Sequence, residues 1–99
     1  MIRLSPEAER QLDELALHYA ERGRDEAIDN LAGAVERACE RYAEGRGSFY
    51  DAPRPYPTVR QPGWRWTKEG RYWLAFTADA HGPIVAAIFF ETADLPRRI

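Results

Sequence analysis

RYWLAFTADAHGPIVAAIFFE, residues 71–91, is the stretch that decides the fold of this chain. It holds two runs rich in aromatic and β-branched residues, 71–78 and 83–91, around the short polar segment DAHG. Such runs on either side of a tight turn predict two antiparallel strands. A further run, GWRWT at 63–67, precedes them across the turn residues KEG. The C-terminal half therefore predicts a small sheet of three antiparallel strands.

Side-chain alternation along these strands predicts a sheet with two apolar faces. In the first run, one face carries Tyr72, Leu74 and Phe76, and the other carries Trp73, Ala75 and Thr77. In the second run, one face carries Ile84, Ala86, Ile88 and Phe90, and the other carries Val85, Ala87 and Phe89. We expect one face to pack on helices and the other to be covered by the C-terminal tail, the proline-rich loop or a partner.

The N-terminal half predicts two helices. Ser5 is a good N-cap, Pro6 suits the first helical position, and Gly23 is a typical helix end. Apolar residues then recur at helical spacing from Arg24 to about Ala43, which predicts an antiparallel helical hairpin. Gly33, inside the second helix, predicts a close helix–helix contact. Residues 1–5 are expected to form a very short strand or an extended arm.

These elements predict an α+β fold in which an N-terminal helical hairpin packs on a small antiparallel sheet, in two layers. The length of 99 residues fits one domain, 1–99, and the 44% hydrophobic content is ordinary for a globular protein. Between helices and strands, the segment 45–64 contains four prolines and is expected to be a long connector.

The overall charge and the cysteine count limit the possible functions. The formal net charge is −2, with the excess of acids before residue 47 and the excess of cations after it. Cys39 is the only cysteine, which excludes an internal disulfide and a cysteine-based zinc cluster. The absence of a long apolar run or signal sequence, together with a single free thiol, predicts a cytoplasmic protein without a membrane segment.

The opening SPEAERQLDE and the closing GRYWLAFTADAHGPIVAAIFFETADLPRRI resemble the RelE/ParE superfamily of bacterial toxin–antitoxin toxins over nearly the whole chain, and the ParE branch most. The resemblance implies a toxin that inhibits DNA gyrase and is neutralised by a ParD-like ribbon-helix-helix antitoxin in a hetero-oligomer, with no cofactor. The alternative within the superfamily is a RelE-like ribosome-dependent mRNA endonuclease using Arg71 and Glu91. A third reading is a toxin fold that acts only as an interaction module.

The end of the last strand argues against catalysis. Nucleases of this fold commonly carry His or Tyr there, whereas this strand ends in Phe89, Phe90 and Glu91. Phenylalanine has no proton to exchange, and an acid at a strand end is more typical of a solvated carboxylate. His18 and His81 lie far apart without metal-ligand spacing. We therefore assign no catalytic residue and no metal site.

The candidate site residues form two sets. Arg65 and Arg71 lie among Trp64, Trp66 and Trp73, a pattern that fits either nucleic-acid stacking or core aromatics between exposed cations. Arg71 is also open to stacking on Trp73 or Trp66, or to pairing with an acid. No sequence-specific nucleic-acid binding is expected of the chain alone. For target contact we select Arg65, Arg71, Arg97 and Arg98. For an apolar antitoxin-binding groove we select Leu12, Leu15, Tyr19, Trp73 and Phe89.

Overall fold

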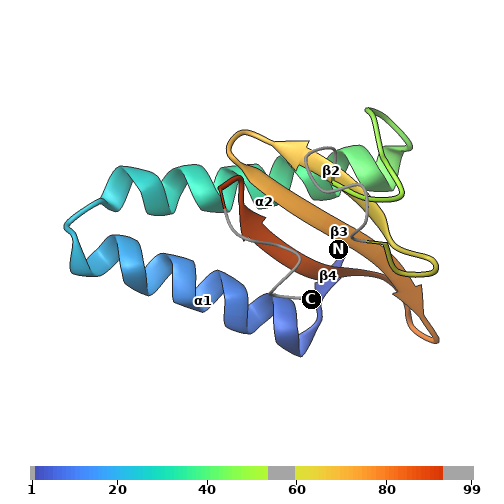
Figure 1. The fold of residues 1–99 in the computed structure, drawn as a ribbon, viewed down its shortest axis with the longest axis horizontal. Helices are drawn as coiled ribbons and strands as arrows, with labels where there is room; N and C mark the ends of the chain where they lie inside the picture. The colour runs from blue at the N-terminus through green and yellow to red at the C-terminus, as the bar shows by residue number, and fades with distance from the viewer. Residues whose placement is uncertain (1, 54–59, 93–99) are drawn as a thin grey trace.

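Two helices lie side by side against one face of a four-stranded sheet (Figure 1). The computed structural model describes residues 2–53 and 60–92. The elements are β1 (Arg3–Leu4), α1 (Pro6–Glu21), α2 (Asp25–Glu44), β2 (Arg65–Glu69), β3 (Tyr72–Asp79) and β4 (Gly82–Phe90). This order confirms the predicted α+β fold with a helical hairpin on a small sheet. Within the described ranges, neither helix has the length and apolarity needed to cross a membrane.

The sheet is mixed rather than purely antiparallel. Its strand order is β1-β4-β3-β2, and the β2–β3 and β3–β4 pairs are antiparallel as predicted. The N-terminal arm forms β1, which pairs in parallel with β4 through Arg3 opposite Ile84 and Leu4 opposite Val85. The parallel pair arises because the helical hairpin and two strands intervene before β4 returns beside β1 in the same direction.

The predicted helix signals act as expected at most of the helix ends. The Ser5 hydroxyl accepts a hydrogen bond from the Ala8 backbone N–H at 3.0 Å, and Pro6 occupies the first turn. The predicted Gly23 follows the end of α1 at φ 65°, and Gly45, which was not predicted, ends α2 at φ 68°, both in the left-handed conformation that favours glycine. Gly33 does not mark a close helix–helix contact. The atoms nearest its missing side chain belong to the Arg37 guanidinium, one turn further along α2.

Both faces of the sheet are buried, as the alternation predicts. On the helix side, Tyr72, Leu74 and Phe76 pack with residues of both helices. A second cluster contains Trp66, Trp73, Ala75, Ala86, Ala87 and Phe89. Tyr50 and Trp64 pack against this second cluster, and Tyr50 exchanges two 2.7 Å backbone hydrogen bonds with Trp66. The connector 45–64 thus supplies part of the cover that the sequence left open.

A β-bulge breaks the predicted alternation along β4. Ala75 is opposite Ala87, but the next residue, Phe76, is opposite Val85, so Ala86 is the extra residue. An extra residue moves all preceding side chains to the other face. Val85 consequently joins Ile88 in the helix-facing core, and Ala86 joins the second cluster, contrary to the sequence-based faces.

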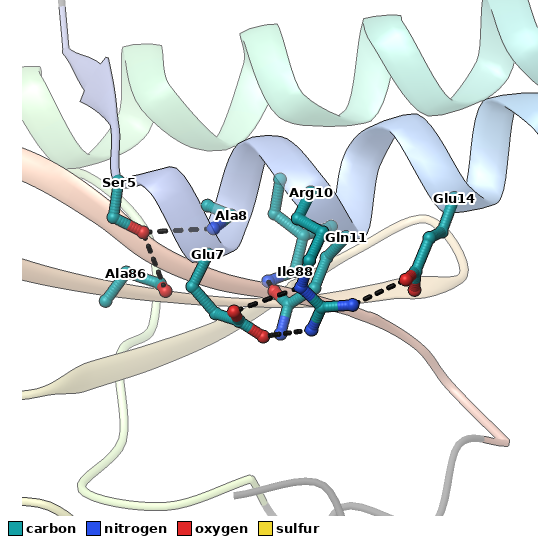
Figure 2. Close-up of polar contacts among 8 residues, drawn as sticks. All are labelled: Ser5, Glu7, Ala8, Arg10, Gln11, Glu14, Ala86 and Ile88. Atoms are coloured by element: carbon teal, nitrogen blue, oxygen red, sulfur yellow. Dashed lines mark hydrogen bonds and ion pairs between the residues drawn. The ribbon is translucent and has the colours of Figure 1, made fainter.

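The outer edge of β4 is completed by polar side chains of α1 (Figure 2). The Ser5 hydroxyl donates to the Ala86 carbonyl at 3.1 Å, and the Gln11 side-chain oxygen accepts from the Ile88 N–H at 2.7 Å. Gln11 is 7% exposed, and its amide nitrogen donates to the Glu7 carboxylate at 3.2 Å. A buried glutamine on the apolar stripe was not predicted, because its acceptor role depends on β4, 77 residues away.

Replacing Gln11 with methionine keeps the side-chain length and removes the acceptor for Ile88. We expect a loss of about 1–3 kcal/mol in the free energy of unfolding, because a buried N–H is left unpaired. Urea denaturation measures it. Asp13→Met, at an exposed position of the same helix, is the control, with an expected change within about 0.5 kcal/mol. Equal effects of the two substitutions would contradict a specific role for Gln11.

Candidate interaction site

A groove of about 470 Å³ runs between α1 and the end of β4. From α1, Gln11, Leu15 and Tyr19 line it, since residues four apart project from the same side of a helix. The opposite wall is formed by Ile88, Phe89, Phe90 and Thr92. Glu14, His18 and Arg24 add polar groups. The groove is therefore apolar along its walls and charged in part of its lining.

The backbone of β4 also faces this groove. The Glu91 N–H donates to the Arg71 carbonyl at 2.8 Å, so Arg71 and Glu91 form a hydrogen-bonded pair of the antiparallel ladder. Such pairs alternate with non-hydrogen-bonded pairs. The N–H and carbonyl groups of Ile88 and Phe90 accordingly point away from β3, towards α1, where Gln11 already binds the N–H of Ile88. The groove thus combines an apolar lining with a strand edge.

The residues predicted for antitoxin binding do not form one surface. Leu15, Tyr19 and Phe89 meet in the groove, while Leu12 packs against the helix-facing core. Trp73 is 3% exposed and belongs to the second cluster, where it meets the Tyr50 ring edge-on at 6.5 Å. Trp73 is accordingly part of the packing of this chain.

The predicted target-contact arginines are also dispersed. Arg65, at the start of β2, donates to the Asp51 carboxylate at 2.8 Å and to the Phe49 carbonyl at 3.2 Å. Arg71 lies beyond the other end of β2, in the turn before β3. Arg97 and Arg98 lie outside the described residues. The interleaved tryptophans are structural in part, since Trp66 is fully buried.

Arg71 pairs with an acid, one of the two alternatives left by the sequence. Its Nε donates to Glu91 Oε1 at 2.8 Å. Its guanidinium lies 5.0 Å from the centre of the Phe90 ring, so the aromatic partner is Phe90 and not a tryptophan. The pair fixes the end of β4 to the turn before β3.

Glu91 is held by two cations instead of being freely solvated. Lys68 Nζ lies 2.9 Å from Oε2, Arg71 binds Oε1, and the carboxylate side chain is 25% exposed. The contacts with Lys68 and then Arg71 hold the pKa of Glu91 below its ordinary value. A carboxylate stabilised in its ionised form takes up a proton less readily, which makes it a weaker general base.

The histidines lie apart in different environments. His18 is exposed on α1, within 3.0 Å of an Arg22 nitrogen, and its ring meets Tyr19 edge-on. His81 occupies the turn between β3 and β4, as predicted, and its backbone N–H donates to the Asp79 carboxylate at 2.7 Å. Over residues 2–53 and 60–92, no three His, Cys, Asp or Glu side chains are grouped as metal ligands. Burial raises the pKa of the half-buried Cys39 thiol.

Comparison with known proteins yields no matching family model and no matching curated protein.

The ion pairs of Glu91 predict a pH dependence. Because its pKa is lowered in the folded state, its stabilising contribution is present above the unfolded pKa of about 4.3 and is lost as pH falls through the folded value. Glu91→Gln is expected to make unfolding less sensitive to pH in this acidic range. Denaturation between pH 2 and 6 measures this.

Lys68→Gln provides a direct test by NMR titration of the carboxylates. It should raise the pKa of Glu91 and leave that of Glu7, which Arg10 lowers, unchanged. An unaltered Glu91 titration in the Lys68→Gln protein would refute the pairing.

Proposed function

We propose that this chain is a ParE-like toxin of a type II toxin–antitoxin system, which inhibits DNA gyrase and is neutralised by a ParD-like antitoxin in the cytoplasm. The resemblance carried by SPEAERQLDE and DLPRRI supports the family. The helical hairpin on a small sheet agrees with the architecture that this resemblance implies. Fold alone does not separate the gyrase-directed members from the ribonucleases, so the choice depends on the site.

The state of Glu91 is the observation that carries the proposal. The ribonuclease alternative needs a group that exchanges a proton near the scissile phosphate, and Glu91 is the acid at the end of the last strand. Its carboxylate is engaged by Lys68 and Arg71, with a lowered pKa. Ion pairs of this kind favour a structural role, and a toxin that acts by binding needs no acid–base group.

The groove between α1 and β4 supports the antitoxin part of the proposal. Leu15 and the half-buried Phe90 offer apolar contacts, and Arg24 offers a positive charge in the same lining. An amphipathic segment with apolar anchors and an acidic flank suits such a groove. In this proposal the antitoxin covers the groove in a hetero-oligomer, while the arginines, including Arg97 and Arg98, contact the target.

Induction of the chain in bacterial cells tests the target. We expect a DNA-damage response and filamentation while translation continues and messenger RNA stays intact. Translation arrest with messenger cleavage, and no damage response, would refute the gyrase proposal in favour of the ribonuclease. The readouts are a damage-responsive reporter, pulse labelling of new protein and mapping of messenger ends.

Glu91→Gln sharpens the same experiment. Binding without proton transfer predicts that toxicity survives, whereas a catalytic Glu91 predicts a loss of about 10²–10⁴-fold in cleavage rate. Glu69→Gln is the matched control, because Glu69 also bridges two cations, Arg37 and Arg41, with its side chain 21% exposed. Loss of toxicity in Glu91→Gln alone would contradict the proposed role.

Leu15→Ala and Leu17→Ala compare two leucines of one helix. Leu15 lines the groove, whereas Leu17 is 60% exposed and lies outside it. We expect Leu15→Ala to weaken binding of the ribbon-helix-helix antitoxin that this proposal requires by about tenfold, as for a central interface contact. Titration calorimetry measures it, with thermal unfolding checking each variant. If Leu17→Ala weakens binding as much, the antitoxin lies elsewhere.

A further inference from the structure

A second pocket, of about 260 Å³, lies between the helical hairpin and the turn that joins β2 to β3. Three arginines line it: Arg24 at the start of α2, Arg37 about three and a half turns later, and Arg71 in the turn. Tyr19 and Tyr72 line it from α1 and β3, on the helix-facing side of the sheet. No acidic side chain is among the described residues that line it.

The arginines keep their terminal nitrogens available. Arg71 and Arg37 each use Nε for their carboxylate, at 2.8 Å from Glu91 and 3.3 Å from Glu69. Among the described residues, the Nη atoms of Arg37 and Arg71 have no hydrogen-bond acceptor. Arg24 likewise has no ion pair with any described residue. The Arg24 guanidinium lies 5.7 Å from the centre of the Tyr19 ring. The planar forks that bind phosphate and carboxylate groups are thus open on all three arginines.

Internal ion pairs leave the pocket positively charged. Glu69 is shared between Arg37 and Arg41, and Glu91 between Lys68 and Arg71. Of these cations Arg37 and Arg71 line the pocket, where Arg24, which has no ion pair among the described residues, joins them. Asp25 and Glu26 follow Arg24 in sequence and line an adjoining depression, which shares Arg24 with the pocket, but they do not line the pocket itself. Among the described residues, the pocket lining therefore carries three guanidinium groups and no carboxylate.

The floor of the pocket is neutral and polar. The hydroxyl oxygens of Tyr19 and Tyr72 lie 2.6 Å apart and are buried. Burial, and then the hydrogen bond with Tyr19, raise the pKa of Tyr72, so the phenol stays protonated. Arg24 and Arg71, which line the pocket from the start of α2 and from the turn before β3, act on this pKa in the opposite direction. The two arginines therefore converge from different elements.

We propose that this pocket binds a phosphate group, held by the arginine forks of Arg24, Arg37 and Arg71. A phosphate monoester carries a charge of about −1.5 to −2 at neutral pH, and its oxygens can accept hydrogen bonds from several guanidinium groups at once. The volume lies below the roughly 300 Å³ at which pockets for drug-sized ligands begin. The pocket thus suits the phosphate itself, with any larger part of the ligand outside.

Titration of the full chain with inorganic phosphate, against chloride at matched ionic strength, tests this. We expect saturable NMR shifts centred on the backbone amides of Gly70, Arg71 and Tyr72. Arg24→Gln and Arg71→Gln should each weaken binding by about 10- to 100-fold, since each removes charged hydrogen bonds. Arg24→Gln breaks no ion pair among the described residues, so its effect on binding is separable from folding, which circular dichroism checks.

Arg10→Gln is the matched control, because Arg10 is a 55%-exposed arginine with two ion pairs on α1, outside the pocket. Shifts that do not saturate, or an equal loss of binding in Arg10→Gln, would overturn the proposal. Phenyl phosphate, in a parallel titration, identifies the source of the ligand. Binding of both compounds supports a phosphate carried on a larger molecule, and binding of inorganic phosphate alone supports the free ion. Failure of both compounds to bind overturns the site.

Discussion

The junction between α1 and β4 fixes the arrangement of the whole chain. Strand β4 has β3 on one side but only the two residues of β1 on the other, so α1 must complete its edge. Ser5 caps α1 and also binds β4 through its N–H to Val85 and its hydroxyl to Ala86. Rotation of α1 would leave the buried Ile88 N–H without Gln11, at a cost of roughly 1–3 kcal/mol. The helix therefore has one orientation, which places Leu15 and Tyr19 beside the end of β4.

Burial of both sheet faces separates packing from recognition. The second cluster contains large rings, including Trp66, Trp73 and Phe89, so its stability depends on keeping them covered. Within the described residues, the Trp66 indole N–H is buried there without a hydrogen-bond partner, and the surrounding apolar contacts must offset roughly 1–3 kcal/mol. The proposed binding surfaces accordingly lie at the edges of the sheet, where the groove and the arginines are found.

Local signals in the sequence determined most of the fold and little of the site. Ser5 with Pro6, and the alternation of β3, are short-range features, and the structure confirms the elements they predict. The bulge at Ala86 depends on which β3 residue lies opposite, and Gln11 depends on a strand end far along the chain. The partners of Arg71 and Glu91 likewise follow from tertiary placement, because charge pattern alone does not specify which ions meet. Residue type suggested the functional groups, but only the fold shows which of them are already engaged.

The two shared carboxylates position arginines of the proposed phosphate site. Glu69 and Glu91 each orient two cations, and Arg37 and Arg71 are bound through Nε, which leaves the ends of their forks directed elsewhere. A carboxylate used in this way stays ionised, since protonation would release both of its partners. The same contact that makes Glu91 a weak base therefore holds Arg71 in a defined position over Phe90. Pre-positioned cations of this kind reduce the ordering cost of binding an anion, which is what the proposed phosphate site requires.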